Sequence, residues 1–93
     1  MKYDIIITNS CKKDIKKASK QGKNIDLLFD IVDQLSDGKK LDPKYKDHKL
    51  SGEYEGKREC HIEPDFLLIY QINEKEIILY LVRVGGHSEL FRS

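Results

Sequence analysis

The apolar pattern of this 93-residue chain changes its period once, and that change limits the possible folds more than any other feature. In the first 38 residues, apolar side chains recur every three or four positions, which is the period of an amphipathic helix. Beyond residue 57 they form short runs separated by turn residues, which is typical of strands. A chain with helices in one half and strands in the other favours an α+β domain.

Two helices are predicted in the first half, after a short β-rich run over residues 3–8. The first is capped at Asn9-Ser10 and ended by Gly22. The second is capped by Asn24 and ends near Gly38. Their expected apolar faces consist of Cys11, Ile15, Ala18, Ile25, Leu28, Phe29, Val32 and Leu35.

Three strands are predicted in the second half, over residues 57–62, 66–72 and 76–84. A loop over 41–46 containing Pro43 precedes them, and Asn73-Glu74-Lys75 separates the last two. The resulting order, β-α-α-β-β-β, predicts a small antiparallel sheet with the two N-terminal helices packed on one face. A chain of this length has room for one core, so residues 1–93 are expected to form a single domain.

Several classes of protein are disfavoured by composition. No apolar run approaches the roughly 20 residues that span a membrane, and the first residues do not resemble a secretion signal. Cys11 and Cys60 lie far apart and form no Cys-x-x-Cys pair, so neither a zinc site nor a redox motif is indicated. Two reduced thiols in a cytoplasmic protein are the simplest interpretation.

Charge is balanced overall, with 17 basic and 16 acidic side chains, but it is unevenly distributed. An acidic stretch over residues 26–37 follows an early group of lysines. Such separation can present one basic face to phosphate, although two solvated helix faces would give the same pattern. The early lysines are Lys12, Lys13, Lys16, Lys17, Lys20 and Lys23.

Side chains suited to proton transfer are concentrated in the second half. It contains all three histidines, several carboxylates and the isolated Arg83. Cleaving RNA without a metal requires a base for the 2′-hydroxyl, an acid for the departing 5′-oxygen and a cation beside the phosphate. The residues that could supply them are His48, Glu59, His61, Glu63, Asp65, Arg83 and His87.

The spacing of these residues also allows two other chemistries. Glu63, His61 and a distant His87 could form a two-histidine, one-carboxylate iron site, but such sites normally lie in larger barrels than this chain can build. Cys60 beside His61 could act as a nucleophile, but neighbours on a strand point to opposite faces. Cys60 is therefore expected in the core.

Three consecutive blocks of sequence resemble the YafQ branch of the RelE/ParE superfamily of bacterial toxins. They are residues 45–52 (YKDHKLSG), 56–70 (GKRECHIEPDFLLIY) and 85–91 (GGHSELF). Their order and spacing also match, and the helical first half fits the family fold. The resemblance covers essentially the whole chain.

This resemblance implies the toxin of a type II toxin–antitoxin system, an endoribonuclease that cleaves messenger RNA on the ribosome without metal or cofactor. The implied partners are a cognate antitoxin, mRNA and ribosomal RNA, with the toxin alone a monomer and no membrane involved. A noncatalytic RelE-like binding module is the alternative. The charge of +1 is less basic than expected for a protein that works on the ribosome.

The family pattern also implies roles for individual residues. His87 matches the general acid, and either Asp65 or His61 would activate the 2′-hydroxyl. His48 would orient the nucleotide or steady the charge of the phosphate, and Arg83 would hold the phosphate.

Three further positions are implied to contact substrate. Phe66 and Phe91 match aromatic positions that could stack on a base, although Phe66 could equally pack into the core. Glu59 stands where the family commonly has aspartate, and Phe66 where it has tryptophan.

Overall fold

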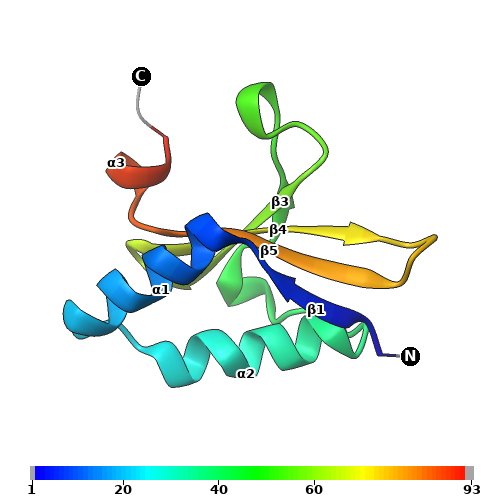
Figure 1. Ribbon diagram of the computed structural model, residues 1–93, viewed down its shortest axis with the longest axis horizontal. Coiled ribbons are helices and arrows are strands. Elements are labelled where there is room, and N and C mark those ends of the chain that lie inside the picture. The colour runs from blue at the N-terminus through cyan, green and yellow to red at the C-terminus, as the bar shows by residue number, and fades with distance from the viewer. Residues whose placement is uncertain (1, 92–93) are drawn as a thin grey trace.

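A computed structural model of the chain describes residues 2–91, which form a five-stranded sheet covered on one face by two helices (Figure 1). The predicted α+β class and β-α-α-β-β-β order are confirmed, with one short strand, one short α-helix and two 3₁₀ helices added. In chain order the elements are β1 (Asp4–Ile7), α1 (Asn9–Lys20), α2 (Ile25–Ser36), η1 (Pro43–Tyr45), β2 (His48–Lys49), η2 (Gly52–Tyr54), β3 (Arg58–Glu63), β4 (Phe66–Asn73), β5 (Ile78–Gly85) and α3 (His87–Leu90), where η denotes a 3₁₀ helix.

The sheet is mixed, whereas an antiparallel sheet was expected. Its strand order is β1-β5-β4-β3-β2, and β1 pairs parallel with β5 while the other pairs are antiparallel. Thr8 fixes the junction between β1 and α1, because its hydroxyl donates to the Val82 carbonyl (2.8 Å) and accepts from the Cys11 amide (3.1 Å). Thr8 is thus the N-cap of α1, in place of the predicted Asn9-Ser10.

The main core lies between the sheet and the helices α1 and α2. The predicted cap of α2 is confirmed, since Asn24 Oδ1 accepts from the Leu27 amide (3.0 Å). The buried residues of this core include Cys11, Ala18, Leu28, Ile31, Val32, Leu35, Cys60, Ile62, Phe66, Leu68, Tyr70, Leu79 and Leu81. Within residues 2–91, no helix combines the length and apolar character needed to cross a bilayer.

The other face of the sheet carries a smaller apolar cluster and the functional groups. Leu67 and Ile69 of β4 pack there with Leu90 of α3. The α3 helix and the η2 segment stand on this side of the sheet, opposite α1 and α2 (Figure 1). Because Cys60 and Ile62 point into the main core, the alternating residues Glu59 and His61 project toward α3. Strand pairing therefore places the polar residues of β3 on the face that α3 borders.

Candidate active site

The three histidines predicted to act together lie side by side, although they come from three different elements. His48 is in β2, His61 in β3 and His87 at the start of α3. The ring centroids of His48 and His61 are 6.2 Å apart, and those of His61 and His87 are 5.5 Å apart in an edge-to-face arrangement. His61 is the central member of the group.

Glu59 lies beneath the first two histidines, and its side chain is only 5% exposed. Its Oε1 atom is 2.9 Å from His61 Nε2 and 3.6 Å from His48 Nε2. A carboxylate can only accept hydrogen bonds, so His61 Nε2 is the donor in the shorter contact. This contact orients the His61 ring, and the other ring nitrogen, Nδ1, stays available to accept a proton.

His48 is oriented by the main chain rather than by a side chain. Lys46 has a left-handed backbone conformation with φ of 51°. Its carbonyl oxygen lies 2.6 Å from His48 Nδ1 and accepts a hydrogen bond from it. A non-glycine residue in this region is uncommon and marks a constrained position. Sequence reasoning missed Lys46, because no side-chain pattern signals a carbonyl that is turned by its own backbone.

Asp65 and His87 form a second pair of a carboxylate and an imidazole. Asp65 lies in the tight turn between β3 and β4. Its Oδ1 atom accepts from both the His87 amide and His87 Nδ1, each at 3.0 Å. These two hydrogen bonds, the amide first, hold the pKa of Asp65 below its usual value. The carboxylate thus stays ionised and leaves His87 Nε2 as the ring nitrogen available to a substrate.

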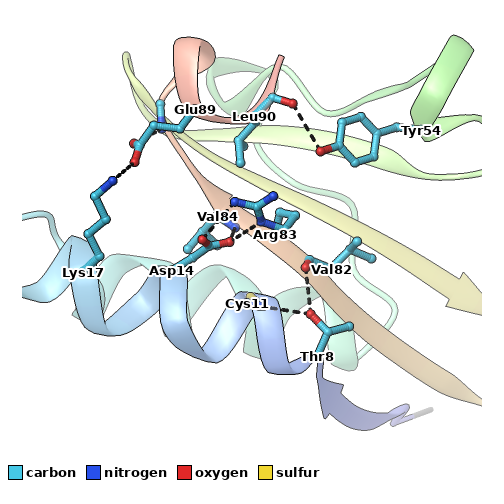
Figure 2. A network of polar contacts seen from close by, with 11 residues as sticks. Thr8, Cys11, Asp14, Lys17, Tyr54, Val82, Arg83, Val84, Glu89 and Leu90 are labelled. Atoms are coloured by element: carbon cyan, nitrogen blue, oxygen red, sulfur yellow. Dashed lines mark hydrogen bonds and ion pairs between the residues drawn. The ribbon is translucent and has the colours of Figure 1, made fainter. Parts of the chain in front are cut away.

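Arg83 does not contact the histidines through any hydrogen bond or ion pair among residues 2–91. Figure 2 shows its guanidinium beside Asp14 of α1, with Nε 2.6 Å from Oδ2 and Nη2 3.1 Å from Oδ1. Asp14 Oδ2 also accepts from the Val84 amide (3.2 Å). This bidentate pair ties α1 to β5, a structural role that the sequence did not suggest.

The two predicted stacking aromatics differ in exposure. Phe66 is fully buried in the main core, so the core interpretation of this residue is the one that the structure shows. Phe91 is 38% exposed and packs edge-to-face against Tyr54, with centroids 5.6 Å apart. The Tyr54 hydroxyl donates to the Leu90 carbonyl (3.2 Å). Tyr54 was missed by sequence reasoning, because the pairing depends on how η2 folds toward α3.

A groove of about 570 Å³ runs past two of the histidines. Its polar lining consists of His61, Glu63 and His87 together with Lys44, Tyr45 and Lys46 of the η1 region. Two lysines beside two histidines make this groove suitable for a phosphodiester. The loop over 41–46 thus supplies cationic side chains that the sequence analysis did not assign to the site.

The two rejected chemistries also do not fit the structure. Cys60 is fully buried, and burial raises the pKa of its thiol far above the usual value, so it is no nucleophile. The iron site does not fit either, because Glu63 Oε1 accepts from the backbone N–H of Asn24 (3.0 Å). A bulge after His61 also interrupts the alternation of side chains along the strand. The residues arranged to hold a metal ion are instead His48, Glu59 and His61, whose ligand atoms lie within 4.8 Å of one another.

Comparison with known families gives a match over nearly the whole chain. Residues 3–92 match the family described as the bacterial toxin of type II toxin–antitoxin systems, YafQ. The mRNA interferase toxin YafQ of Escherichia coli K12 is 37% identical over 89 residues, which are 95% of each chain.

Solved structures agree with the sequence matches. The metal-bound toxin from Helicobacter pylori has a TM-score of 0.90 and 46% identity, and the alignment covers 96% of this chain and 99% of that one. YafQ in the E. coli DinJ–YafQ toxin–antitoxin complex has a TM-score of 0.87 and 35% identity, with 98% and 99% covered.

Proposed function

This chain belongs to the YafQ family of bacterial type II toxins, and from that premise we propose that it is an endoribonuclease that cleaves messenger RNA by acid–base catalysis without a metal. Its E. coli relative is an mRNA interferase, and the two chains align over 95% of their lengths. The ribosome is the expected setting, where the exposed lysines of α1 would contact ribosomal RNA.

The observation that carries this proposal is a pair of carboxylate-oriented histidines on one groove. Glu59 holds His61 by Nε2, and Asp65 holds His87 by Nδ1. In each ring the carboxylate fixes one nitrogen and leaves the other for proton transfer. The two rings are 5.5 Å apart and both line the groove, so one can act as base while the other acts as acid.

His61 is the proposed base and His87 the proposed acid. The 2′-hydroxyl gives its proton to His61 Nδ1, and its oxygen attacks the adjacent phosphorus. The bond from phosphorus to the 5′-oxygen breaks as His87 Nε2 donates a proton to that oxygen. The products are a 2′,3′-cyclic phosphate and a 5′-hydroxyl, and no other reactant is consumed. Asp65 is the weaker choice of base, because both hydrogen bonds from His87 occupy it and lower its pKa.

Charge and stacking would hold the RNA in place. Lys44 and Lys46 line the groove and are placed to neutralise the phosphate. Arg83 can take that role only if it exchanges Asp14 for the phosphate, so we assign it first to anchoring α1. His48 would steady the nucleotide beside His61, and Phe91 would stack on a base with Tyr54 as its support.

His87→Ala tests the reaction directly, with Ser88→Ala on the same short helix as the matched control. Loss of a positioned acid costs about 10²–10⁴-fold in rate, whereas Ser88→Ala should cleave like the wild type. Messenger-RNA cleavage on purified ribosomes in the presence of EDTA is the measurement, with circular dichroism to confirm folding. A folded His87→Ala protein that cleaves at the wild-type rate would overturn the assignment of His87 as the acid. Absence of cleavage by the wild type would support the noncatalytic alternative instead.

A cognate antitoxin is the proposed protein partner, by analogy with the DinJ–YafQ complex. The toxin alone would be a monomer and the complex a heteromer. An acidic segment of the antitoxin would neutralise the lysines that border the groove. Calorimetric titration with the product of the adjacent gene should show tight binding. The resulting complex should no longer cleave RNA. Absence of a complex would contradict this assignment.

A further inference from the structure

Asp47 stands between two residues of the candidate site, and its own side chain is held by the sheet. It follows Lys46, whose carbonyl accepts from the His48 ring, and it directly precedes β2. Its Oδ1 atom accepts from the Tyr70 hydroxyl (2.6 Å) and from Arg58 Nε (3.2 Å). Tyr70 and Arg58 are direct partners in the pairing of β4 with β3. Asp47 therefore ties the segment that carries His48 to two strands of the sheet.

The contact with Tyr70 is the shorter of the two and reaches into the main core. Tyr70 is 1% exposed and packs there among apolar side chains, so its ring has little freedom to move. A separation of 2.6 Å is typical of a hydroxyl that donates to a carboxylate, which is a strong hydrogen bond. Burial, and then the hydrogen bond to Asp47, raise the pKa of the Tyr70 hydroxyl well above its usual value. The hydroxyl therefore stays protonated and remains a donor.

The pairing of β2 with β3 gives His48 limited support. The β2 strand has two residues and pairs with β3 at two positions, and the His48 side chain is 49% exposed. Lys46 also has a left-handed backbone conformation, which persists in a non-glycine residue only where the surrounding structure maintains it. Asp47 is the residue between them, and its two hydrogen bonds supply that support.

The Asp47 anchor and the His48 ring lie on opposite faces of the sheet. Tyr70 belongs to the core beneath α1 and α2, whereas the His48 ring lies beside that of His61, on the face that α3 borders. This is the arrangement expected of neighbours in an extended chain, whose side chains point to opposite faces. A shift of Asp47 on one face would therefore move the carbonyl before it and the imidazole after it together.

We propose that Asp47, held by Tyr70, is a positioning residue that sets the orientation of His48 in the active site. Asp47 acts through the main chain on either side of it and not on the RNA itself. With Asp47 in place, the Lys46 carbonyl lies 2.6 Å from His48 Nδ1 and selects this ring nitrogen to carry the hydrogen. The effect on RNA cleavage rests on the proposed function of the chain, whereas the effect on the His48 ring does not.

The first measurement is ¹⁵N NMR of the imidazole nitrogens, recorded in EDTA at about pH 8.5, where a histidine of ordinary pKa is neutral. In the wild type, His48 Nδ1 should carry the hydrogen. Tyr70→Phe removes the hydroxyl that donates to Asp47 but keeps the ring in the core, and it should lower the share of this tautomer. Asp47→Ala should lower that share further, because it removes both hydrogen bonds.

Tyr80→Phe is the matched control, because it removes a hydroxyl from a half-buried tyrosine of β5, two strands away from β3. It should leave the His48 tautomer as in the wild type. Circular dichroism checks that each variant is folded, and Tyr70→Phe decides the matter if Asp47→Ala is not. An unchanged His48 tautomer in folded Tyr70→Phe, or an equal change in Tyr80→Phe, would overturn the proposal.

A second measurement, the rate of RNA cleavage on ribosomes, tests the consequence for the reaction. Tyr70→Phe should cleave about 10-fold more slowly, since small displacements of an active-site group are costly. In a His48→Ala background the same change should slow cleavage little further, because it acts through His48. Fully additive losses, or a changed tautomer with undiminished cleavage, would overturn the role in the reaction alone. A wild type that does not cleave RNA would count against the proposed function, and the NMR comparison would still decide whether Asp47 orients His48.

Discussion

Among single residues, Gly86 leaves the site little room for an added side chain. A Cβ atom there would lie 2.8 Å from Asp65 Oδ2, closer than van der Waals contact permits. The Asp65 side chain is 66% exposed and can swing away, but it would then leave His87. The absence of a side chain at Gly86 thus permits the pairing that orients the proposed acid.

We therefore expect Gly86→Ala to reduce RNA cleavage by about 10- to 100-fold, because displacing a catalytic group by about 1 Å can cost that much. Stability should change by less than about 0.5 kcal/mol. In an Asp65→Asn background, Gly86→Ala should reduce the cleavage rate little further, since both changes disturb the pairing of Asp65 with His87. Fully additive losses in a double-mutant cycle would show that Gly86 acts in some other way.

Ile77 is a second constrained residue, in the turn between β4 and β5. Its φ is 58°, which is rare for a β-branched side chain and costs on the order of 1–3 kcal/mol. Asparagine tolerates this conformation, so Ile77→Asn should raise the free energy of unfolding by about 1 kcal/mol. The expected rise in Tm is about 4–8 °C for a domain of this size.

Ile78→Asn is the control for this change, because Ile78 is the first residue of β5 and has no positive φ. It should lower Tm, since it places a polar side chain in a strand that pairs with both β1 and β4. A Tm that falls equally in both variants, measured by circular dichroism, would mean that side-chain packing outweighs backbone strain at Ile77.

At the scale of elements, the docking of α3 depends on Glu89. Its carboxylate accepts from Lys17 Nζ of α1 (2.7 Å; Figure 2) and from the Gly86 amide (3.0 Å). These contacts, that of Lys17 first, lower the pKa of Glu89 below its ordinary value. Their stabilisation is therefore complete above the unfolded pKa of about 4.3 and is lost as pH falls through the lower folded value.

An NMR titration of the Glu89 side chain can measure this effect. In Lys17→Met the Glu89 pKa should rise toward its ordinary value, because the largest cause of its depression is removed. The amides of Leu90 and Phe91, which close α3, should report loosening at a correspondingly higher pH. Lys20→Met, at the end of the same helix, should leave the titration unchanged. An unchanged pKa in Lys17→Met would contradict the role of this ion pair.

The elements themselves were largely predictable from sequence, and the exceptions have physical causes. Helix and strand periods identified α1, α2 and the four longer strands, because each has enough residues for a pattern. The two-residue β2 and the four-residue α3 are too short for one. The parallel pairing of β1 depends on which sheet edge it joins, and sequence period carries no such information.

The site was predicted only in part from the sequence. Sequence resemblance indicated His48, His61 and His87, and the structure places them in one group. It could not indicate that Asp14 occupies Arg83 or that Phe66 faces the core, because both depend on side-chain direction in the folded chain. The contact of the Lys46 carbonyl with His48 could not be predicted either, because it is made by the backbone and not by a side chain.

At the scale of the whole molecule, Cys11 and Cys60 report on whether the chain opens as one unit. Cys11 lies in α1 and Cys60 in β3, and both are fully buried in the core between helices and sheet. Burial raises the pKa of the Cys11 thiol to about 12 and that of Cys60 further still. Because the thiolate is the reactive form, neither should react in the folded state.

We expect Cys11→Ala and Cys60→Ala, each with one thiol left, to be labelled by a disulfide reagent at similar rates. If the chain is a single cooperative domain, global unfolding is the event that exposes either sulfur, so both rates should follow the same unfolding equilibrium. Adding a cysteine at the exposed position 20 provides a control that should be labelled at once. A thiol labelled much faster in one variant, at equal stability, would show that α1 or β3 opens separately from the rest of the core.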